Sequence, residues 1–436
     1  MQTSTVSSLA TALRQRRQRL AQQISAPVLI NSGQPQARNF PANTYPFRAS
    51  SHFLYFAGLP LPHAAICLEN GKLTLFIDEA SPESALWHGP TPTREAIAQE
   101  IGADAAYPLS ELTQQTGSAN QLVAPTENPE LAAAIVQLRL THDHWAIAEM
   151  RQAAAVSVKA HQTGMAATPT AKTEAEVRAA MEQVIMAHQM TCAYNSIVTT
   201  HGQVLHNEKY HHVLEAGDLL LADVGAEAAS GWASDITRTW PVSGKFSATQ
   251  RDIYDIVLAA HDACIAQAQP GVEYRHLHLI ACYRIAEGLV DLGILRGQPE
   301  SLVEQDAHAL FFPHGVGHLI GLDVHDMEDL GDLAGYAPGR QRSDRFGLCF
   351  LRLDRPLQAG MAVTIEPGFY QVPNILNSPQ RRAKYQSVIN WERLAQFEDV
   401  RGIRIEDDIL ITANGCEVLT ADLPTQPAVI EHWVSR

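Results

Sequence analysis

The chain has 436 residues, 46% of them apolar, which is enough for two or three domains with a large buried core. It carries 32 lysines and arginines against 47 aspartates and glutamates, a formal net charge of −15. Such an acidic surface repels a phosphate backbone, so no nucleic-acid partner is expected. No stretch approaches the ~20 apolar residues that span a bilayer, so no membrane partner is expected either.

The six cysteines are widely spaced and include no Cys-x-x-Cys pair. This spacing is typical of reduced, buried thiols rather than of a disulfide framework, and it gives no sign of a thiolate zinc site. The basic run LRQRRQRL at 13–20 is not followed by an apolar segment, so we expect no signal peptide. These features predict a cytoplasmic location.

The first part of the chain has the pattern of an α/β domain, which we place at residues 1–141. Asn70-Gly71 lies between two β-like runs and is the strongest short-range signal of a hairpin. Helical and short extended patterns then alternate up to residue 140. The predicted elements are a helix at 7–24 and strands at 27–30, 64–69 and 72–78.

A second domain is predicted at residues 142–436, because a long alanine-rich helical pattern begins there. Thr173 with Glu176 fits a capping box, and Ser247 or Thr249 caps a later helix. Helices that flank one mostly antiparallel sheet make this an α+β domain. The predicted helices begin near residues 143, 173, 248 and 276, and the predicted strands cover 194–200, 218–224, 233–241, 361–366 and 402–411.

Five side chains that can bind a metal ion lie within apolar or glycine-rich segments. They are Asp223, Asp235, His318, Glu366 and Glu406. A buried carboxylate without a cation is very costly, and Arg404 could neutralise one of the four carboxylates but not all of them. Two divalent ions would neutralise all four, lower the pKa of a bridging water and polarise a carbonyl group. This oxygen-rich set favours manganese, with cobalt or zinc as alternatives.

Each of these residues taken alone has an ordinary structural explanation. An aspartate at a strand end is usually a cap, and a lone histidine is usually a hydrogen-bonded core residue. His314 and His318 have the spacing of helical zinc ligands, but Gly315 and Gly317 argue against a helix, and the chain has no His-Glu-x-x-His. It is the combination of five such positions that indicates a metal site.

Several segments resemble one known enzyme family. They are LLLADVG, SDITRTWP, PHGVGHLIGLDVHD, LQAGMAVTIEPGFY and GIRIEDDILIT, in the family order within residues 143–421. The family is the metallopeptidase group of prolidase, aminopeptidase P and methionine aminopeptidase, which share the pita-bread fold. The resemblance implies a pita-bread second domain in which the five residues named above bind two metal ions.

The resemblance also implies a role for individual residues at the metal centre. Asp235 and Glu406 would each bridge both ions. Glu366 would take the proton from the bridging water and so act as the general base. Arg404 would hold the acidic ligands in place and belongs to the predicted substrate-binding set.

Three histidines match family positions around the substrate. His206, in VLHN, matches the histidine on the substrate side of the first strand. His314 matches the histidine that contacts substrate. His325 matches the one that stabilises the tetrahedral intermediate, in the manner of an oxyanion hole. The expected partner is a small peptide with an Xaa-Pro bond, a tertiary amide without an N–H group.

The amino-terminal segment separates the members of this family. YPFRASSHFLYFAGL at 45–59 resembles a domain that prolidases and aminopeptidases P share and that methionine aminopeptidase lacks. GLCFLRLDRPLQAG at 347–360 and the insert between 370 and 401 resemble prolidase more closely. Arg352 is the candidate for gripping the substrate's carboxylate; the alternative is a surface arginine paired with Asp354.

These features favour an Xaa-Pro dipeptidase (prolidase), which hydrolyses dipeptides with C-terminal proline by means of a hydroxide that bridges two divalent metals. The alternative is an Xaa-Pro aminopeptidase (aminopeptidase P), which releases the first residue of longer peptides. A non-catalytic relative or a metal-free, creatinase-like enzyme is disfavoured because all five metal ligands are present. The resemblance also suggests a homodimer.

Overall fold

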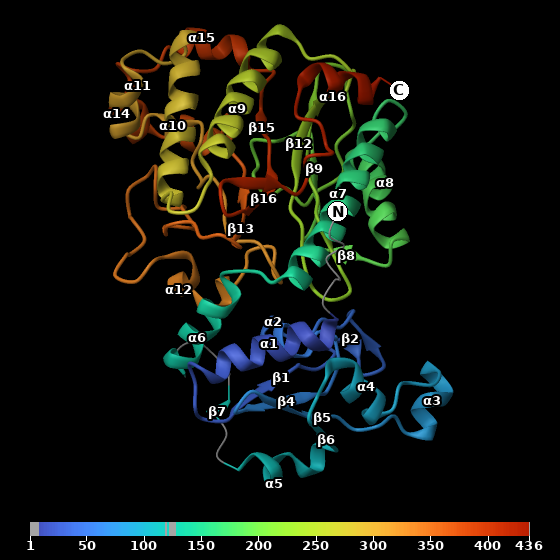
Figure 1. Ribbon diagram of the computed structural model, residues 1–436. Helices are drawn as coiled ribbons and strands as arrows, with labels where there is room; N and C mark the ends of the chain where they lie inside the picture. Colours follow the sequence, from blue (N-terminus) through green and yellow to red (C-terminus); the bar gives the residue numbers. More distant parts are fainter. Residues whose placement is uncertain (1–7, 118–119, 122–127, 436) are drawn as a thin grey trace, which may run out of the picture. The chain divides into compact units, whose positions relative to one another are not determined.

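The computed structural model describes residues 8–117, 120–121 and 128–435, and the chain divides into two compact units (Figure 1). The first unit comprises Met1–Glu149, Ala229–Trp232 and Met327–Leu333. The second comprises Met150–Ala228, Ala233–Asp326 and Ala334–Arg436. Two short segments from later in the chain therefore group with the amino-terminal unit.

The first unit contains a mixed five-stranded sheet. Its strands are β1 (Val28–Asn31), β4 (Ala65–Glu69), β5 (Lys72–Phe76), β6 (Ala105–Tyr107) and β7 (Asn120–Gln121), and β2 (Ala37–Phe40) and β3 (Asn43–Thr44) form a separate hairpin. The sheet order is β6-β5-β4-β1-β7, with antiparallel pairs in the centre and parallel strands at both edges. The helices are α1 (Leu9–Ala21), α2 (Ser51–Ala57), α3 (Pro82–His88), α4 (Arg94–Ile101), α5 (Leu112–Thr116) and α6 (Pro129–Arg139).

The predicted hairpin of the first unit is confirmed. Glu69 pairs with Lys72 across the turn, and Asn70 and Gly71 have φ angles of 50° and 76°, as a two-residue hairpin turn requires. Helix α1 begins directly after Ser8, whose side chain accepts a hydrogen bond from the backbone of the first turn. Residue 7, where the predicted helix starts, lies outside the described residues.

The later part of the chain carries long helices and short strands. The helices are α7 (His144–Ala167), α8 (Glu174–Ala187), α9 (Ala248–Gln267), α10 (Tyr274–Asp291), α11 (Pro299–Glu304), α12 (Asp332–Gly335), α13 (Pro373–Leu376), α14 (Pro379–Tyr385), α15 (Trp391–Leu394) and α16 (Pro427–Val434). The strands are β8 (Thr191–Cys192), β9 (Ile197–Thr199), β10 (Leu219–Asp223), β11 (Ala226–Glu227), β12 (Thr237–Pro241), β13 (Ala362–Ile365), β14 (Gly368–Tyr370), β15 (Gly402–Arg404), β16 (Asp407–Ile411) and β17 (Cys416–Val418).

The strands of the second unit are antiparallel, as predicted, but they form four small sheets instead of one. These sheets are β12-β10-β9, β13-β16-β17, β14-β15 and β11-β8. The strand predicted at 402–411 is divided at Ile405 and Glu406. Their backbone N–H groups donate to the carbonyl oxygens of Pro367 and Thr237, so the chain changes pairing partner there. This interruption places Glu406 at a junction between sheets.

One of the two predicted helix caps is confirmed and the other is wrong. Ser247 and Gln250 form a reciprocal capping box at the start of α9. Thr173 precedes α8, but its side chain makes no capping hydrogen bond. The Glu176 carboxylate instead accepts from the backbone N–H of Lys172, at 2.8 Å.

All six cysteines lie within the described residues and are free thiols, in agreement with their spacing. Cys67, Cys264 and Cys282 are buried. Among the residues that the structure describes, no helix combines the length and the apolar character needed to cross a bilayer.

Candidate active site

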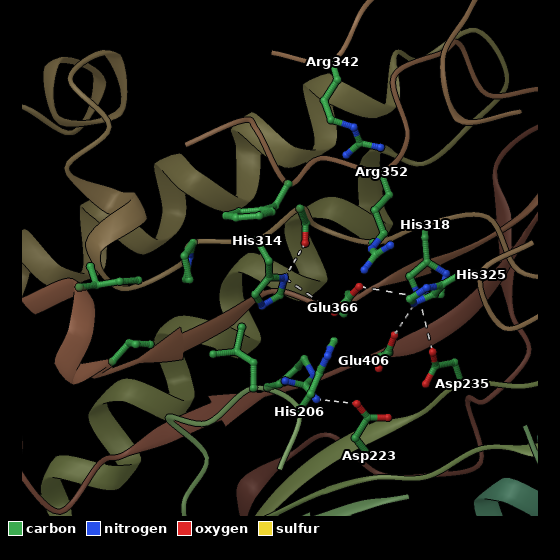
Figure 2. A pocket seen from close by; sticks show the side chains of 18 residues that line it. His206, Asp223, Asp235, His314, His318, His325, Arg342, Arg352, Glu366 and Glu406 are labelled. Carbon is green, nitrogen blue, oxygen red and sulfur yellow. Dashed lines mark hydrogen bonds and ion pairs between the residues drawn. The ribbon is translucent and has the colours of Figure 1, made fainter. Parts of the chain in front are cut away.

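A cavity of about 570 Å³ lies in the second unit, and every site residue predicted from the sequence lines it (Figure 2). These residues are His206, Asp223, Asp235, His314, His318, His325, Arg352, Glu366, Arg404 and Glu406. Leu205, Phe350, Val372 and Ile375 add an apolar part of the wall. The fold therefore gathers around one space residues that are far apart in the sequence.

Strand pairing brings the four carboxylates together. Asp223 ends β10 opposite Thr237, and Asp235 lies two residues before Thr237. Thr237 also bridges to Glu406. Glu366 directly follows β13, which pairs with β16 just after Glu406. Each acidic residue therefore stands at a strand end where two sheets meet, and all four face the cavity.

His318 lies in the glycine-rich loop and points one ring nitrogen at the acidic residues. Its Nδ1 lies 2.9 Å from the Leu319 carbonyl oxygen, so Nδ1–H donates there and Nε2 carries the lone pair. A side chain at the preceding Gly317 would place its Cβ 2.3 Å from the Thr364 oxygen, so only glycine fits. The Nε2 atom lies 3.5 Å from Asp235, 3.8 Å from Glu366 and 4.0 Å from Glu406.

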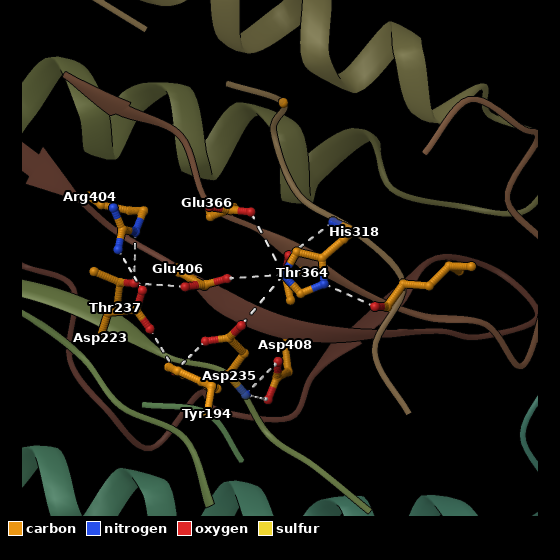
Figure 3. A network of polar contacts seen from close by, with 12 residues as sticks. Tyr194, Asp223, Asp235, Thr237, His318, Thr364, Glu366, Arg404, Glu406 and Asp408 are labelled. Atoms are coloured by element: carbon orange, nitrogen blue, oxygen red, sulfur yellow. Dashed lines mark hydrogen bonds and ion pairs between the residues drawn. The ribbon is translucent and has the colours of Figure 1, made fainter. Parts of the chain in front are cut away.

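Arg404 is the protein cation of this cluster (Figure 3). Its guanidinium donates to Asp223 Oδ2 at 2.5 Å and to the Thr237 hydroxyl at 3.0 Å. The Thr237 hydroxyl in turn donates to Glu406 Oε2 at 2.7 Å. Arg404 therefore neutralises one carboxylate directly, as the sequence suggested.

The remaining carboxylates repel one another in a buried space. Burial, with repulsion from Asp223, raises the pKa of Asp235 to about 7. Burial also raises the pKa of Glu366 to about 7. Burial, with repulsion from Asp235 and Glu366, raises the pKa of Glu406 well above its usual range. These carboxylates need cations if they are to stay ionised together at neutral pH.

The donor set fits divalent metal ions. One ligand atom each from Asp235, His318 and Glu406 lies within 4.8 Å of the other two. Oxygen atoms dominate, with one imidazole and no thiolate, which suits hard to borderline ions. The mutual repulsion described above is the interaction that bound cations relieve.

The three predicted substrate-side histidines differ in their surroundings. His314 is held on both sides: Nδ1–H donates to the Gly315 oxygen at 2.8 Å, and Nε2 lies 2.9 Å from the Tyr370 hydroxyl. Burial lowers the pKa of His314 to about 3, so the ring is neutral. Burial also lowers the pKa of His206. The His325 ring packs edge-on against that of His318, with centroids 4.2 Å apart.

Arg352 lies above Glu366 and His318 in the cavity wall, and Arg342 lines the same side (Figure 2). Asp354, the partner in the alternative interpretation of Arg352, is held by other arginines. It lies 2.8 Å from Arg340 and 3.7 Å from Arg275. The position of Arg352 is therefore compatible with contact to a substrate in the cavity.

Two family models match this chain. Residues 148–413 match metallopeptidase family M24, and residues 13–124 match the amino-terminal domain of aminopeptidase P. The first match covers more than half of the sequence. The chain belongs to metallopeptidase family M24. The predicted family, the α+β fold with a pita-bread domain and the assignment as a metallopeptidase are thus confirmed.

The curated relatives of this M24 peptidase include fungal proteins of similar length. A probable Xaa-Pro aminopeptidase from Botryotinia fuckeliana is 34% identical over 398 residues, which cover 86% of this chain and 85% of the relative. A probable Xaa-Pro aminopeptidase from Verticillium alfalfae is 34% identical over 417 residues, covering 89% and 88%.

Solved structures similar to this M24 peptidase include bacterial aminopeptidases P. The Pseudomonas aeruginosa aminopeptidase PepP aligns with a TM-score of 0.81 and 28% identity over 99% of both chains. An Escherichia coli aminopeptidase P variant in complex with substrate aligns with a TM-score of 0.82, again at 28% identity over 99% of both chains.

These relatives favour the alternative activity over the prolidase that the sequence suggested. The prolidase prediction depended on the segment at 347–360 and on the insert between 370 and 401. Proteins named Xaa-Pro aminopeptidase match this chain along nearly its whole length. The names of these relatives therefore support the aminopeptidase P alternative over the prolidase prediction.

Sequence reasoning missed several polar residues of the site. The Tyr194 hydroxyl lies 2.6 Å from Asp223 Oδ1 and 2.5 Å from Asp235 Oδ1, and it joins the two aspartates (Figure 3). Tyr370 lies between Arg404 and His314, 2.9 Å from each. No spacing rule pointed to Tyr194. Tyr370 lies in EPGFY, four residues after Glu366, at the end of a segment that resembles the family.

Proposed function

We propose that the chain is an Xaa-Pro aminopeptidase, which releases the first residue from peptides whose second residue is proline. The observation that carries this proposal is the match to proteins of that name across both the amino-terminal and the M24 parts. The proposal replaces the dipeptidase that the sequence alone favoured.

Five residues are proposed to hold two divalent metal ions in the cavity: Asp223, Asp235, His318, Glu366 and Glu406. When bound, the ions would lower the pKa of a water and polarise the scissile carbonyl. Manganese remains the favoured metal because oxygen ligands predominate, with cobalt or zinc as alternatives.

Glu366 is proposed as the general base. One of its carboxylate oxygens lies 3.8 Å from His318 Nε2 and the other 3.8 Å from His314 Nδ1, and the side chain lines the cavity. A carboxylate here can accept a proton from the attacking water. It can then return this proton to the proline nitrogen, which must be protonated to leave as an amine.

The other residues are proposed to bind and orient the peptide. Arg404 donates to the Tyr370 hydroxyl, which lies 2.9 Å from His314 Nε2. The neutral His314 ring is therefore held in one orientation. His206 and His325 also line the cavity, and His325 is the proposed donor to the oxyanion that develops at the scissile carbonyl. Arg352 is the proposed contact for a carboxylate or backbone carbonyl of the substrate.

A comparison of two substrates tests the proposed activity. Metal-loaded enzyme is assayed with Ala-Pro and with Ala-Pro-Ala, and kcat/KM is measured for each. We expect the tripeptide to be preferred by about tenfold or more, because an aminopeptidase gains binding energy beyond proline. Ala-Ala-Ala is the control for the proline requirement. A preference for Ala-Pro over Ala-Pro-Ala would restore the prolidase interpretation.

Other predictions from the sequence stay proposals. The domain boundary at residues 141 and 142, the cytoplasmic location and the homodimer belong to this group. Size-exclusion chromatography with light scattering tests the dimer: a monomeric mass at micromolar concentration would reject it.

A further inference from the structure

Among the described residues, three clusters bring histidine, cysteine or acidic side chains close enough to hold a metal ion. One is the active-site group. A second joins Glu174, His201 and His212, but the Glu174 carboxylate already accepts hydrogen bonds from Thr199, Thr200 and His212. The third consists of His278, Cys282 and His308, and three of its four ring nitrogens have no hydrogen-bond partner.

The third cluster is built by two adjacent elements. His278 and Cys282 lie one turn apart on the same face of α10. His308 begins a short 3₁₀ helix at His308–Leu310. His278 and Cys282 are fully buried and His308 is 2% exposed, yet a ligand atom from each lies within 4.8 Å of the others.

Several ring nitrogens in this cluster have no hydrogen-bond partner. Neither nitrogen of His308 has one, and neither does His278 Nδ1. The other His278 nitrogen, Nε2, lies 2.9 Å from the Gly347 carbonyl oxygen and 3.4 Å from Cys282 Sγ. Leaving buried polar atoms unpaired is costly, and the two rings that carry these atoms belong to one cluster of possible metal ligands, so the cluster is a candidate binding site.

The chain also approaches the cluster closely at Gly347. A Cβ atom on this residue would lie 3.0 Å from His308 Nε2 and 2.6 Å from Asp306 Oδ1. The Asp306 carboxylate is paired with Arg345 at 2.8 Å. Glycine thus lets the backbone approach both imidazoles, and its carbonyl oxygen lies beside His278 Nε2.

We propose that His278, Cys282 and His308 form a second kind of metal site in this protein, one for zinc, with the Gly347 carbonyl oxygen as a neighbouring donor. One thiolate and two imidazoles suit a borderline-soft ion, unlike the oxygen-rich set of the active site. On binding, the Cys282 thiol loses its proton to water and the sulfur becomes the ligand. The sequence has no Cys-x-x-Cys, so only the fold assembles this set.

The site would brace the wall of the active-site cavity. It ties α10 to the 3₁₀ helix and to the segment after Gly347, which carries Phe350 and Arg352. The Phe312 ring lies between His278 and His314, with centroid distances of 5.6 and 4.9 Å. The ion would therefore be structural, since none of its proposed ligands lines the active-site cavity.

Cobalt is a suitable probe because a Co²⁺–thiolate bond gives a near-ultraviolet charge-transfer band, and no thiol belongs to the active-site ligands. Metal-free full-length protein is titrated with Co²⁺ alone. We expect the band in the wild type, its loss in Cys282→Ala and its weakening in His308→Gln. We also expect Cys282→Ala to bind one equivalent fewer and to keep peptidase turnover within about twofold.

Cys264→Ala is the matched control. Cys264 is also fully buried, on α9, but its thiol donates to the Leu277 carbonyl oxygen and lies in no such cluster. This variant should keep the band, and Zn²⁺ should bleach it in the wild type. No band in the wild type, a band that survives in Cys282→Ala, or its loss in Cys264→Ala would each overturn the proposal. The wild-type result decides even if a variant misfolds.

Discussion

Glu406 and Asp407 are neighbours in the chain and both are buried, yet their surroundings are opposite. Glu406 faces the cavity among other carboxylates, and burial raises its pKa well above the usual range. Burial alone would also raise the pKa of Asp407, but Arg238 and His261 outweigh it and lower this pKa to about 2. Arg238 lies 2.8 Å and His261 3.0 Å from the Asp407 carboxylate.

The difference arises because successive side chains of an extended segment point to opposite sides. On the side of Asp407, the protein supplies its own cations and the buried charges are balanced. On the cavity side, Arg404 balances Asp223, and the other carboxylates lack a comparable partner. The contrast teaches that buried charge by itself is not the sign of a functional site. The sign is buried charge that the protein leaves unbalanced.

Removal of metal should give the largest difference between the cavity side, with Glu406, and the side of Asp407. Dialysis against a chelator should reduce turnover of Ala-Pro-Ala below detection, because the cavity carboxylates then lose their cations, and added Mn²⁺ should restore it. The Asp407 side should be unaffected, so far-ultraviolet circular dichroism should show a folded protein throughout. Turnover that persists unchanged after exhaustive chelation would reject the two-metal proposal.

Substitution of the proposed general base should have the second-largest effect on turnover. Glu366→Gln should lower kcat for Ala-Pro-Ala by about a hundredfold to ten-thousandfold, because an amide cannot accept the proton from water. Metal content, measured on the purified variant, separates loss of the base from loss of a ligand. A kcat within about threefold of the wild type would remove Glu366 from this role.

The acidic residues were found from the sequence because their positions violate a local pattern. Asp223 and Glu366 end apolar runs that read as strands, and a charge there is unexpected. The single-sheet expectation failed for a related reason. Periodicity predicts strand character along 402–411, but it does not reveal that Ile405 and Glu406 change partner to other strands.

Residues that act through long-range contacts had no such signal. Tyr194 joins two aspartates that follow it by 29 and 41 positions, a contact that only the fold creates. The cation that balances Asp407 could not be predicted from the sequence for the same reason. Arg238 reads as an ordinary residue of a β-strand until Asp407 is found beside it, 169 positions away.

Stability gives the third way to test the comparison, since substitution should destabilise the protein at Asp407 but not at Glu406. Asp407→Asn leaves the Arg238 guanidinium buried without its carboxylate and should cost about 3–5 kcal/mol of unfolding free energy. Glu406→Gln in metal-free protein removes one of several like charges and should not lower the melting temperature. Thermal unfolding of the metal-free proteins measures both.

The thermal test needs a matched baseline, because metal binding stabilises the folded state by mass action. Each variant is therefore compared with wild type in the same chelator. Equal destabilisation by Glu406→Gln and Asp407→Asn would mean that the two sides do not differ in charge balance. Added metal should raise the melting temperature of Glu406→Gln less than that of the wild type, since the variant lacks a proposed ligand.

Substitution of Arg352 should have the smallest effect of the changes proposed. Its surroundings differ from those of Arg238. Arg238 meets a protein carboxylate, whereas Arg352 lines the cavity wall and is proposed to meet the substrate. Arg352→Ala should raise KM for Ala-Pro about tenfold, equivalent to about 1.4 kcal/mol of binding, with little change in kcat or melting temperature. The effect on Ala-Pro-Ala should be smaller, because its terminal carboxylate lies one residue further along.

Arg342→Ala, on the same side of the cavity, is the matched control. If Arg342→Ala raises KM as much as Arg352→Ala, the two arginines act as a general positive field, and Arg352 is not a specific clamp.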